Sequence, residues 1–397
     1  MKIIHLSDLH LGKRLNDFPM IEDQKYILTK IINVIDDEKP QAVIIAGDIY
    51  DKSIPPAEAV QLFDDFVCRL AQRDLQVFVI SGNHDSAERI AFGSRLMDMS
   101  GVHMSRVYDG NVSPVVLEDE YGAVNFYMLP FVKPINVRAA FKTEGLATYT
   151  EAVSYAVDQM KINTAERNVL ITHQFVTGAS RSDSEEISVG GTDNVDASSF
   201  GGFDYVALGH IHGPQNIGSE RIRYCGTPLK YSFSEKDQEK SVTVVELGAN
   251  GGAAGGASPE GGASPMCEIL VRTVALEPQH DMREIRGKYE EVISRKFYEG
   301  TATDDYLRVI LTDEEDIVDG LTRLRTVYPN IMKLEYDNLR TRSASRVEGR
   351  ADAEELTPNQ LFAALFETQN GKAMDDEQEA LVNQLIEDIW EGGNETC

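Results

Sequence analysis

Five short polar motifs, each placed just after a stretch typical of a β-strand, constrain the fold of this chain most strongly. They are DLH at residues 8–10, GDIYD at 47–51, GNHD at 82–85, TH at 172–173 and GHIH at 209–212. Neighbouring strands of one sheet end side by side, so side chains that follow different strands can converge on one pocket. Glycines beside the polar residues allow the sharp turns and close backbone approach that such loops need.

Short apolar runs rich in Val, Ile or aromatic residues predict seven strands in the first 247 residues. The predicted strands cover residues 3–7, 42–46, 76–80, 123–129, 168–172, 205–208 and 242–247. Apolar residues at helical spacing predict two amphipathic helices between the first three strands, around residues 27–35 and 60–70. This order favours a mixed sheet, or two packed sheets, flanked by helices.

The composition then divides the rest of the chain into three parts. Residues 248–266 are rich in Gly, Ala, Ser and Pro and predict a flexible insertion or linker. Residues 267–338 predict a small α/β domain. Its expected elements are a strand at 268–274, a helix at 280–295, a strand at 306–311, a helix at 314–327 and a strand at 331–336.

Residues 339–397 predict a basic linker followed by an acidic helical tail for binding a partner, with docking of the tail on the protein's own core as the alternative. The linker contains Arg340, Arg342, Arg346 and Arg350, which a solvated segment explains better than a phosphate-binding patch. Thr357 and Pro358 suit the start of one helix, and Asp375 and Asp376 suit the start of a second.

The charge balance limits what the chain binds unaided. Lys and Arg number 38 against 65 Asp and Glu, a formal net charge of −27. This argues against tight unassisted binding to nucleic acid, unless a partner or bound cations supply the attraction to phosphate. An acidic host proteome would also explain the charge. Four scattered cysteines without a CxxC pair, no signal peptide and no long apolar run predict a cytoplasmic protein outside the membrane.

The motifs contain the residue types of a metal centre. Five of the eight histidines lie in them, together with carboxylates and an amide but no thiolate. Such nitrogen and oxygen ligands suit Mn²⁺, Fe²⁺ or Zn²⁺ better than a structural thiolate zinc site would. Two divalent ions bridged by one carboxylate are the usual arrangement for hydrolysing phosphate esters. We expect His5, His103 and His280, which lie outside the motifs, to be packed or solvated.

In this order, the five motifs resemble the pattern of the calcineurin-like metallophosphoesterase superfamily. The resemblance implies an α/β fold with a two-sheet sandwich flanked by helices, a small α/β capping domain that binds DNA at residues 267–338, and a C-terminal helical tail. It also implies two metal sites that share Asp48. The implied ligands are Asp8, His10, Asp48 and His212 at one ion, and Asp48, Asn83, His173 and His210 at the other. His84 resembles the catalytic histidine, and Asp51 and Asp85 resemble groups that orient histidines or loops.

Longer matches narrow the resemblance to the nuclease subunits of bacterial DNA-break processing complexes. They include MKIIHLSDLHLGK, SGNHDS, ALGHIHGPQ and YCGTPLKYSFSE, and Lys52 stands where phosphoprotein phosphatases have Arg. This resemblance implies a Mn²⁺-dependent exonuclease on duplex ends and endonuclease on hairpins and single strands. It also implies a coiled-coil ATPase partner and a homodimer within a heterotetramer. A hydrolase of small phosphodiesters or cyclic nucleotides is the alternative enzyme, and a non-cleaving DNA-end scaffold should have lost ligands that are present here.

Overall fold

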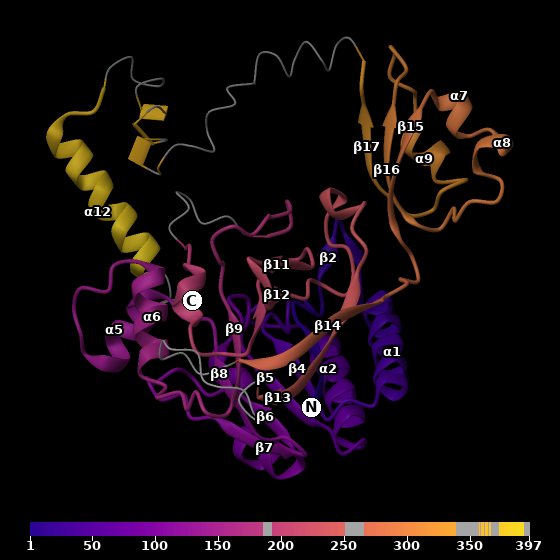
Figure 1. Cartoon of the computed structure of the whole chain (residues 1–397). Coiled ribbons are helices and arrows are strands. Elements are labelled where there is room, and N and C mark those ends of the chain that lie inside the picture. Colours follow the sequence, from indigo (N-terminus) through magenta and orange to yellow (C-terminus); the bar gives the residue numbers. More distant parts are fainter. Residues whose placement is uncertain are drawn as a thin grey trace. The chain divides into compact units, whose positions relative to one another are not determined.

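The computed structural model describes residues 1–185, 193–250, 266–338, 357, 359–360, 362–363, 365–366 and 373–392. One compact unit comprises residues 1–185 and 194–338, and helix α12 (Asp376–Gly392) belongs to a second unit. Within the first unit, two six-stranded sheets and one three-stranded sheet carry the architecture (Figure 1). Every helix among the described residues is too short or too polar to be a transmembrane segment.

The first sheet has the strand order β14-β13-β1-β4-β5-β6. Its strands are β1 (Lys2–Leu6), β4 (Ala42–Ala46), β5 (Gln76–Ile80), β6 (Val102–Met104), β13 (Ser241–Asn250) and β14 (Cys267–Ala275). Side chains alternate between its faces, because successive strand residues point in opposite directions. On one face, Ile4, Val43 and Val77 pack against helices α1 (Ile21–Glu38) and α2 (Ala57–Ala71).

The second sheet has the order β11-β12-β10-β9-β8-β7. Its strands are β7 (Val115–Asp119), β8 (Gly122–Leu129), β9 (Arg167–His173), β10 (Tyr205–Gly209), β11 (Gln215–Ile217) and β12 (Ser219–Tyr224). Helix α6 (Tyr149–Asp158) packs on one face of this sheet, with α5 (Pro134–Phe141) beside it. The other face meets the first sheet, where Phe78 and Phe126 stack with their ring centroids 4.3 Å apart.

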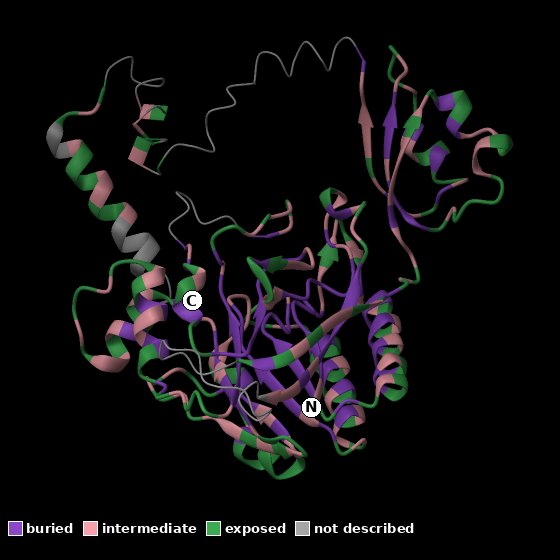
Figure 2. Cartoon of the chain, in the orientation of Figure 1, coloured by how far each residue is buried: buried purple, intermediate pink, exposed green. Residues whose placement is uncertain are grey.

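These layers confirm the predicted two-sheet sandwich flanked by helices, and the buried residues concentrate in the two sheets (Figure 2). All seven predicted strands are present, as are both predicted helices. The remaining short elements of this region are β2 (Arg14–Leu15), β3 (Phe18–Pro19), α3 (Ala87–Ile90), α4 (Ser94–Met97) and three 3-10 turns at Asp98–Ser100, Ala197–Phe200 and Phe233–Glu235. The predicted linker lies mostly in residues 251–265, outside the described part of the chain.

The small domain departs from the sequence-based expectation in two strands. The strand expected at 268–274 exists as β14, but it pairs antiparallel with β13 in the first sheet and is not part of the small sheet. The helix expected at 280–295 is wrong. Residues Met282–Gly287 instead form β15, parallel to β16 (Tyr306–Leu311), which also pairs with β17 (Ile331–Tyr336). Sheet pairing here overrides an apolar spacing that also fits a helix, a common outcome for short segments.

The helices that accompany this three-stranded sheet are short. They are α7 (Tyr289–Val292), α8 (Arg295–Tyr298) and α9 (Gly320–Leu324). The helix expected at 314–327 is reduced to α9, because Asp319 adopts a left-handed φ of 53° just before it. His280 Nδ1 and the Tyr306 hydroxyl lie 2.9 and 2.7 Å from the buried carboxylate of Asp23 on α1, which ties the small domain to the first sheet's helices.

Both predicted helix starts in the tail are present. The backbone N–H of Gln360 donates to Thr357 Oγ1 at 3.3 Å, and that of Gln378 donates to Asp375 Oδ1 at 2.9 Å. Each glutamine side chain accepts a hydrogen bond from the backbone of its capping residue, which completes a capping box. Pro358 and the four arginines of the predicted basic linker lie outside the described residues.

Candidate metal centre

The five polar motifs meet at the carboxyl ends of strands from both sheets. Three of them follow β1, β4 and β5, which are parallel neighbours in the first sheet. The other two begin in the last residues of β9 and β10, which are parallel neighbours in the second. Backbone hydrogen bonds join the first two loops, from Asp8 N to the carbonyl of Gly47 and from His10 N to the carbonyl of Asp48, each 3.0 Å long. The predicted convergence of the motifs is therefore present in the fold.

The loops hold their polar residues in an unusual backbone conformation. Asp8, His10 and Asp48 have positive φ angles of 53°, 44° and 49°, in the left-handed region that side chains other than glycine rarely adopt. Such conformations cost free energy and persist where surrounding contacts enforce them, often at functional sites. Gly209 permits the close approach of the two sheets, because a Cβ there would collide with the carbonyl oxygen of Ala46.

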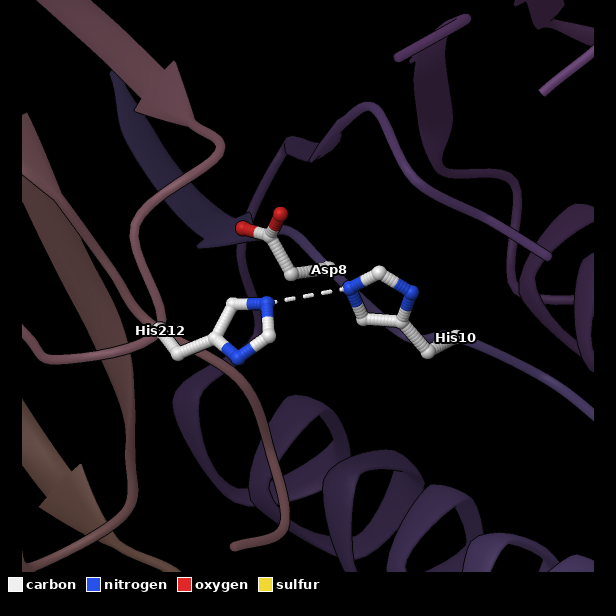
Figure 3. A group of neighbouring side chains, drawn as sticks. All are labelled: Asp8, His10 and His212. Carbon is white, nitrogen blue, oxygen red and sulfur yellow. Dashed lines mark hydrogen bonds between the residues drawn. The ribbon is translucent and has the colours of Figure 1, made fainter. Parts of the chain in front are cut away.

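Asp8, His10 and His212 form one cluster of potential ligands (Figure 3). All three side chains are buried, and their nearest nitrogen and oxygen atoms lie within 4.8 Å of one another. The Nε2 atoms of His10 and His212 are 3.1 Å apart. Two imidazole nitrogens that bind one ion at about 2.0–2.1 Å each would lie at a similar separation.

A second cluster surrounds Asn83. Its Oδ1 atom lies 3.0 Å from His173 Nε2 and 2.9 Å from His210 Nδ1. Asp48 lies between the clusters, with Oδ2 3.3 Å from His173 Nε2 and 3.7 Å from His10 Nε2. The seven residues predicted as ligands are thus brought together in two adjacent groups that share Asp48. Their roles as ligands remain a prediction.

His84 is the most exposed histidine of the centre, with 19% of its side chain accessible. Its Nδ1 atom donates to the carbonyl oxygen of Asp51 at 3.0 Å, which directs Nε2 toward Asp48 Oδ2, 3.9 Å away. Asp85 accepts hydrogen bonds from the backbone N–H groups of Ile49, Tyr50 and Gly82. The side chain of Asp85 and the backbone of Asp51 therefore orient loops and a histidine, as the sequence predicts for these two positions.

The electrostatics of the centre favour a bound cation. Burial raises the pKa of Asp8 to about 6, and burial together with Asp48 raises the pKa of Asp85 to about 7. Burial also raises the pKa of Asp48, but His173, His10 and His84 together hold that pKa well below its usual range. Burial lowers the pKa of His173, yet Asp48, Asp8 and the backbone of Ala46 together raise it to about 9. Within the described residues, Asp48 forms ion pairs with histidines alone.

This donor set fits divalent metal ions. The side chains directed into the centre offer imidazole nitrogens, carboxylates and one amide oxygen, all ligands of intermediate or hard character. Positive charge among the buried carboxylates would offset the burial and mutual repulsion that raise the pKa of Asp8. The clustered side chains therefore indicate a divalent metal site, and their donor chemistry leaves the identity of the metal open.

The sequence did not assign a role to four residues that contact the motif residues of the centre. Gln24 on α1 donates through Nε2 to the carbonyl of His10 at 2.7 Å, and Tyr231 donates to the carbonyl of Leu9 at 2.7 Å. Ser184 and Glu235 approach the outer nitrogen of His212. Tyr231 and Glu235 both lie in the YCGTPLKYSFSE match, which marked them without assigning a role. Ser184 and Gln24 carry no comparable signal.

The three histidines outside the motifs lie away from this centre. His5 Nδ1 is 2.9 Å from the hydroxyl of Tyr205 between the sheets, and His103 contacts Asp98 and Gln76. His280 contacts Asp23. These contacts agree with the expectation that the three side chains are packed or solvated.

Comparison with known proteins agrees with the geometry. The family model described as calcineurin-like phosphoesterase matches residues 1–214, and one described as type 5 capsule protein repressor C-terminal domain matches residues 278–370. The chain therefore belongs to the calcineurin-like phosphoesterase family and is an enzyme that hydrolyses phosphate esters.

Curated relatives narrow the comparison. The chain is 34% identical to the SbcD subunit of the SbcCD nuclease of Staphylococcus epidermidis, over 84% of this chain and 85% of the relative. It is 33% identical to the SbcD protein of Staphylococcus saprophyticus, over 84% of each. Among solved structures, a dimetal phosphatase from Danio rerio matches at 12% identity with a TM-score of 0.36, over 69% of this chain and 98% of that chain. That similarity is too low to support an argument.

Proposed function

We propose that the chain is a metal-dependent DNA nuclease of the SbcD type. It acts as an exonuclease on duplex ends and as an endonuclease on hairpins and single strands, together with a coiled-coil ATPase of the SbcC type. The observation that carries the proposal is the position of Asp48 between two groups of buried ligands, with His173 at 3.3 Å and His10 at 3.7 Å. The nuclease names of the relatives, matched over 84% of this chain, support DNA as the substrate.

In this proposal two Mn²⁺ ions would be held by the centre, with Asp48 as a shared ligand. Asp8, His10 and His212 would hold one ion, and Asn83, His173 and His210 would hold the other. Such a pair of ions lowers the pKa of bound water and neutralises charge on the phosphoryl oxygens. His84 would be the catalytic residue: the carbonyl of Asp51 holds its Nδ1 atom, and Nε2 would contact the phosphate and the leaving oxygen of a bound substrate.

The net charge and an exposed apolar group fit a protein that works in a complex of several subunits. A net charge of −27 makes the chain alone a weak ligand for DNA, so the ATPase supplies much of the affinity. Phe92, Leu96 and Met99 are 82%, 75% and 85% exposed, and this apolar group after the GNHD motif serves as the contact of a homodimer. Sedimentation of the Phe92→Glu variant tests this contact, because the dimer should dissociate to monomers.

The helical tail provides the contact with the ATPase. Leu381 and Leu385 on α12 are 58% and 48% exposed, and acidic residues occupy much of the same helix. An apolar stripe on a short helix gains stability by packing into a partner's groove. Acidic residues beside the stripe steer it toward basic groups on the coiled coil.

The experiment that tests the function compares substrates. Purified chain with Mn²⁺ is offered linear duplex DNA, hairpin DNA, a cyclic nucleotide and the small diester bis(p-nitrophenyl) phosphate. Cleavage of both DNA substrates in preference to the cyclic nucleotide supports the nuclease. Efficient turnover of the cyclic nucleotide, with intact DNA, would instead identify the alternative hydrolase of small phosphodiesters.

A further inference from the structure

His212 differs from His173 and His84 in the kind of group that hydrogen-bonds to its Nδ1 atom. His173 Nδ1 donates to the carbonyl oxygen of Ala46 at 2.8 Å, and His84 Nδ1 donates to that of Asp51 at 3.0 Å. His212 Nδ1 instead lies 2.6 Å from the hydroxyl of Ser184. Its orientation therefore depends on side chains, which a substitution can remove without altering the backbone.

The hydroxyl of Ser184 is in turn held by Glu235. The Oγ atom of Ser184 hydrogen-bonds to Oε1 of Glu235, a fully buried carboxylate. An ionised carboxylate accepts hydrogen bonds and donates none, so the serine proton points to Glu235. The serine oxygen is then left to accept the proton on His212 Nδ1. This fixes the imidazole tautomer whose Nε2 lone pair faces His10 and Asp8.

Lys240 completes the arrangement. A fully buried carboxylate is costly unless it is paired, and Lys240 Nζ lies 2.6 Å from Glu235 Oε2. The same ammonium group donates to the carbonyl oxygen of His212 at 2.9 Å. Lys240 is itself 5% exposed. The buried ion pair of Glu235 and Lys240 therefore positions His212 in two ways. Glu235 holds the imidazole ring through Ser184, and Lys240 holds the backbone carbonyl.

We infer that Ser184, Glu235 and Lys240 are positioning residues that keep His212 ready to bind a metal ion. The inference rests on the proposed assignment of His212 as a ligand of one of the two ions. Outer partners of metal-binding histidines commonly change metal affinity by about 10–100-fold when they are removed. We call the chain of contacts from Lys240 through Glu235 and Ser184 to His212 the relay. It affects the ion held by Asp8, His10 and His212, and the ion at His173 does not depend on it.

The test measures Mn²⁺ binding by the intact chain, with free Mn²⁺ followed by electron paramagnetic resonance. Ser184→Ala should lower the affinity for one of the two Mn²⁺ ions by about 10–100-fold. The affinity for the other ion should stay within about twofold of that of the natural chain. Ser184→Thr keeps the hydroxyl and should restore the affinity. Ser234→Ala is the matched control, because Ser234 Oγ accepts from Asp183 N in the same loop at 3.0 Å without touching His212.

The outcomes separate this inference from the proposed function. If His212→Ala leaves both ions bound as in the natural chain, the metal assignment itself is wrong. If His212→Ala loses one ion but Ser184→Ala binds both normally, the relay is wrong and the metal centre stands. Equal weakening by Ser184→Ala and Ser234→Ala would also overturn the relay, because loop attachment alone would then explain the effect. Glu235→Gln paired with Lys240→Met removes both buried charges together and should weaken the same single ion.

Discussion

Asp48 Oδ2 lies 3.3 Å from His173 Nε2, although the two residues follow strands of different sheets. Asp48 comes after β4 in the first sheet, and His173 ends β9 in the second. The contact joins the two halves of the sandwich at the point where both metal groups meet. In the proposed centre, Asp48 is therefore the residue shared by both groups of ligands.

The Asp48→Ala variant should lose both metal ions together. In the proposed centre, Asp48 is the one residue that contacts both ions, so its removal leaves each group one ligand short. Metal analysis of the dialysed protein should find close to no Mn²⁺, against two ions in the natural chain. Retention of close to two ions by the variant would contradict the bridging role.

The His84→Gln variant should keep its metal and lose its activity. A positioned histidine is typically worth about 10²–10⁴-fold in rate, and His84 is assigned to catalysis and not to coordination. Nuclease rates and Mn²⁺ content are measured on the same preparation, with His103→Gln as a control for a histidine outside the centre. Activity near the natural level, or loss of metal, would show the assignment to be wrong.

Stability of the metal-free protein should fall as the pH rises from about 7 to about 9. His173 has its pKa raised from 6.5 to about 9 in the folded state, so it contributes stability below pH 6.5 that is lost as the pH passes through 9. Asp85, with its pKa raised to about 7, is half ionised at the start of this window, and its remaining ionisation lowers stability in the same direction. The loss is on the order of 3 kcal/mol at most.

Urea unfolding of the chelator-treated protein across this pH range measures that loss. Saturating Mn²⁺ should remove the dependence, because a metal-bound imidazole carries no titrating proton. Stability that stays constant or rises between these pH values in the metal-free protein would contradict the charge balance described for the centre.

Removal of the tail should separate partner binding from catalysis. A chain lacking residues 351–397 should no longer co-purify with the ATPase, yet it should still hydrolyse bis(p-nitrophenyl) phosphate with Mn²⁺. The Leu381→Asp, Leu385→Asp double variant should act like the truncation, because both side chains are exposed on α12. Gln384→Ala, at an exposed polar position of the same helix, is the control. If the truncated chain still captures the ATPase, the tail is not the contact.

The two main sheets were predictable because their strands carry unambiguous signals. The strands ending near Ser7, Ala46, Ile80 and Thr172 are short, apolar and followed directly by polar motifs, so neither their type nor their role in placing the loops is in doubt. Strand β12, with the sequence SERIRY, lies between β11 and β10 in the second sheet, but it has no such pattern and is not predicted. Its pairing partners, and not its own composition, make it a strand.

The small domain shows where local pattern fails. Met282, Tyr289 and Val292 have spacings compatible with a helical stripe, but the first of them belongs to β15 and the others to α7. The deciding contact is the parallel pairing of β15 with β16, more than twenty residues further along the chain. Pairing between strands this far apart in the sequence cannot be predicted from the residues of one short segment alone.

The candidate metal centre was likewise predictable from the sequence only in part. Its motif residues could be gathered from their order and their positions after strands. The support of His212 by Ser184 could not, because Ser184 lies in a polar loop whose approach to the centre is set by tertiary structure. Glu235 was within a matched segment, but its burial beside Lys240 is visible only in the fold.

The central claim is a metal-dependent nuclease that works with an ATPase, and cleavage of end-labelled DNA tests it most directly. Duplex and hairpin substrates are incubated with the chain and Mn²⁺, with and without the ATPase, beside the His84→Gln variant. The account predicts Mn²⁺-dependent shortening of duplex ends and opening of hairpins, stimulated by the ATPase and abolished in the variant. Intact DNA in every reaction, or equal cleavage by the His84→Gln variant, would contradict it.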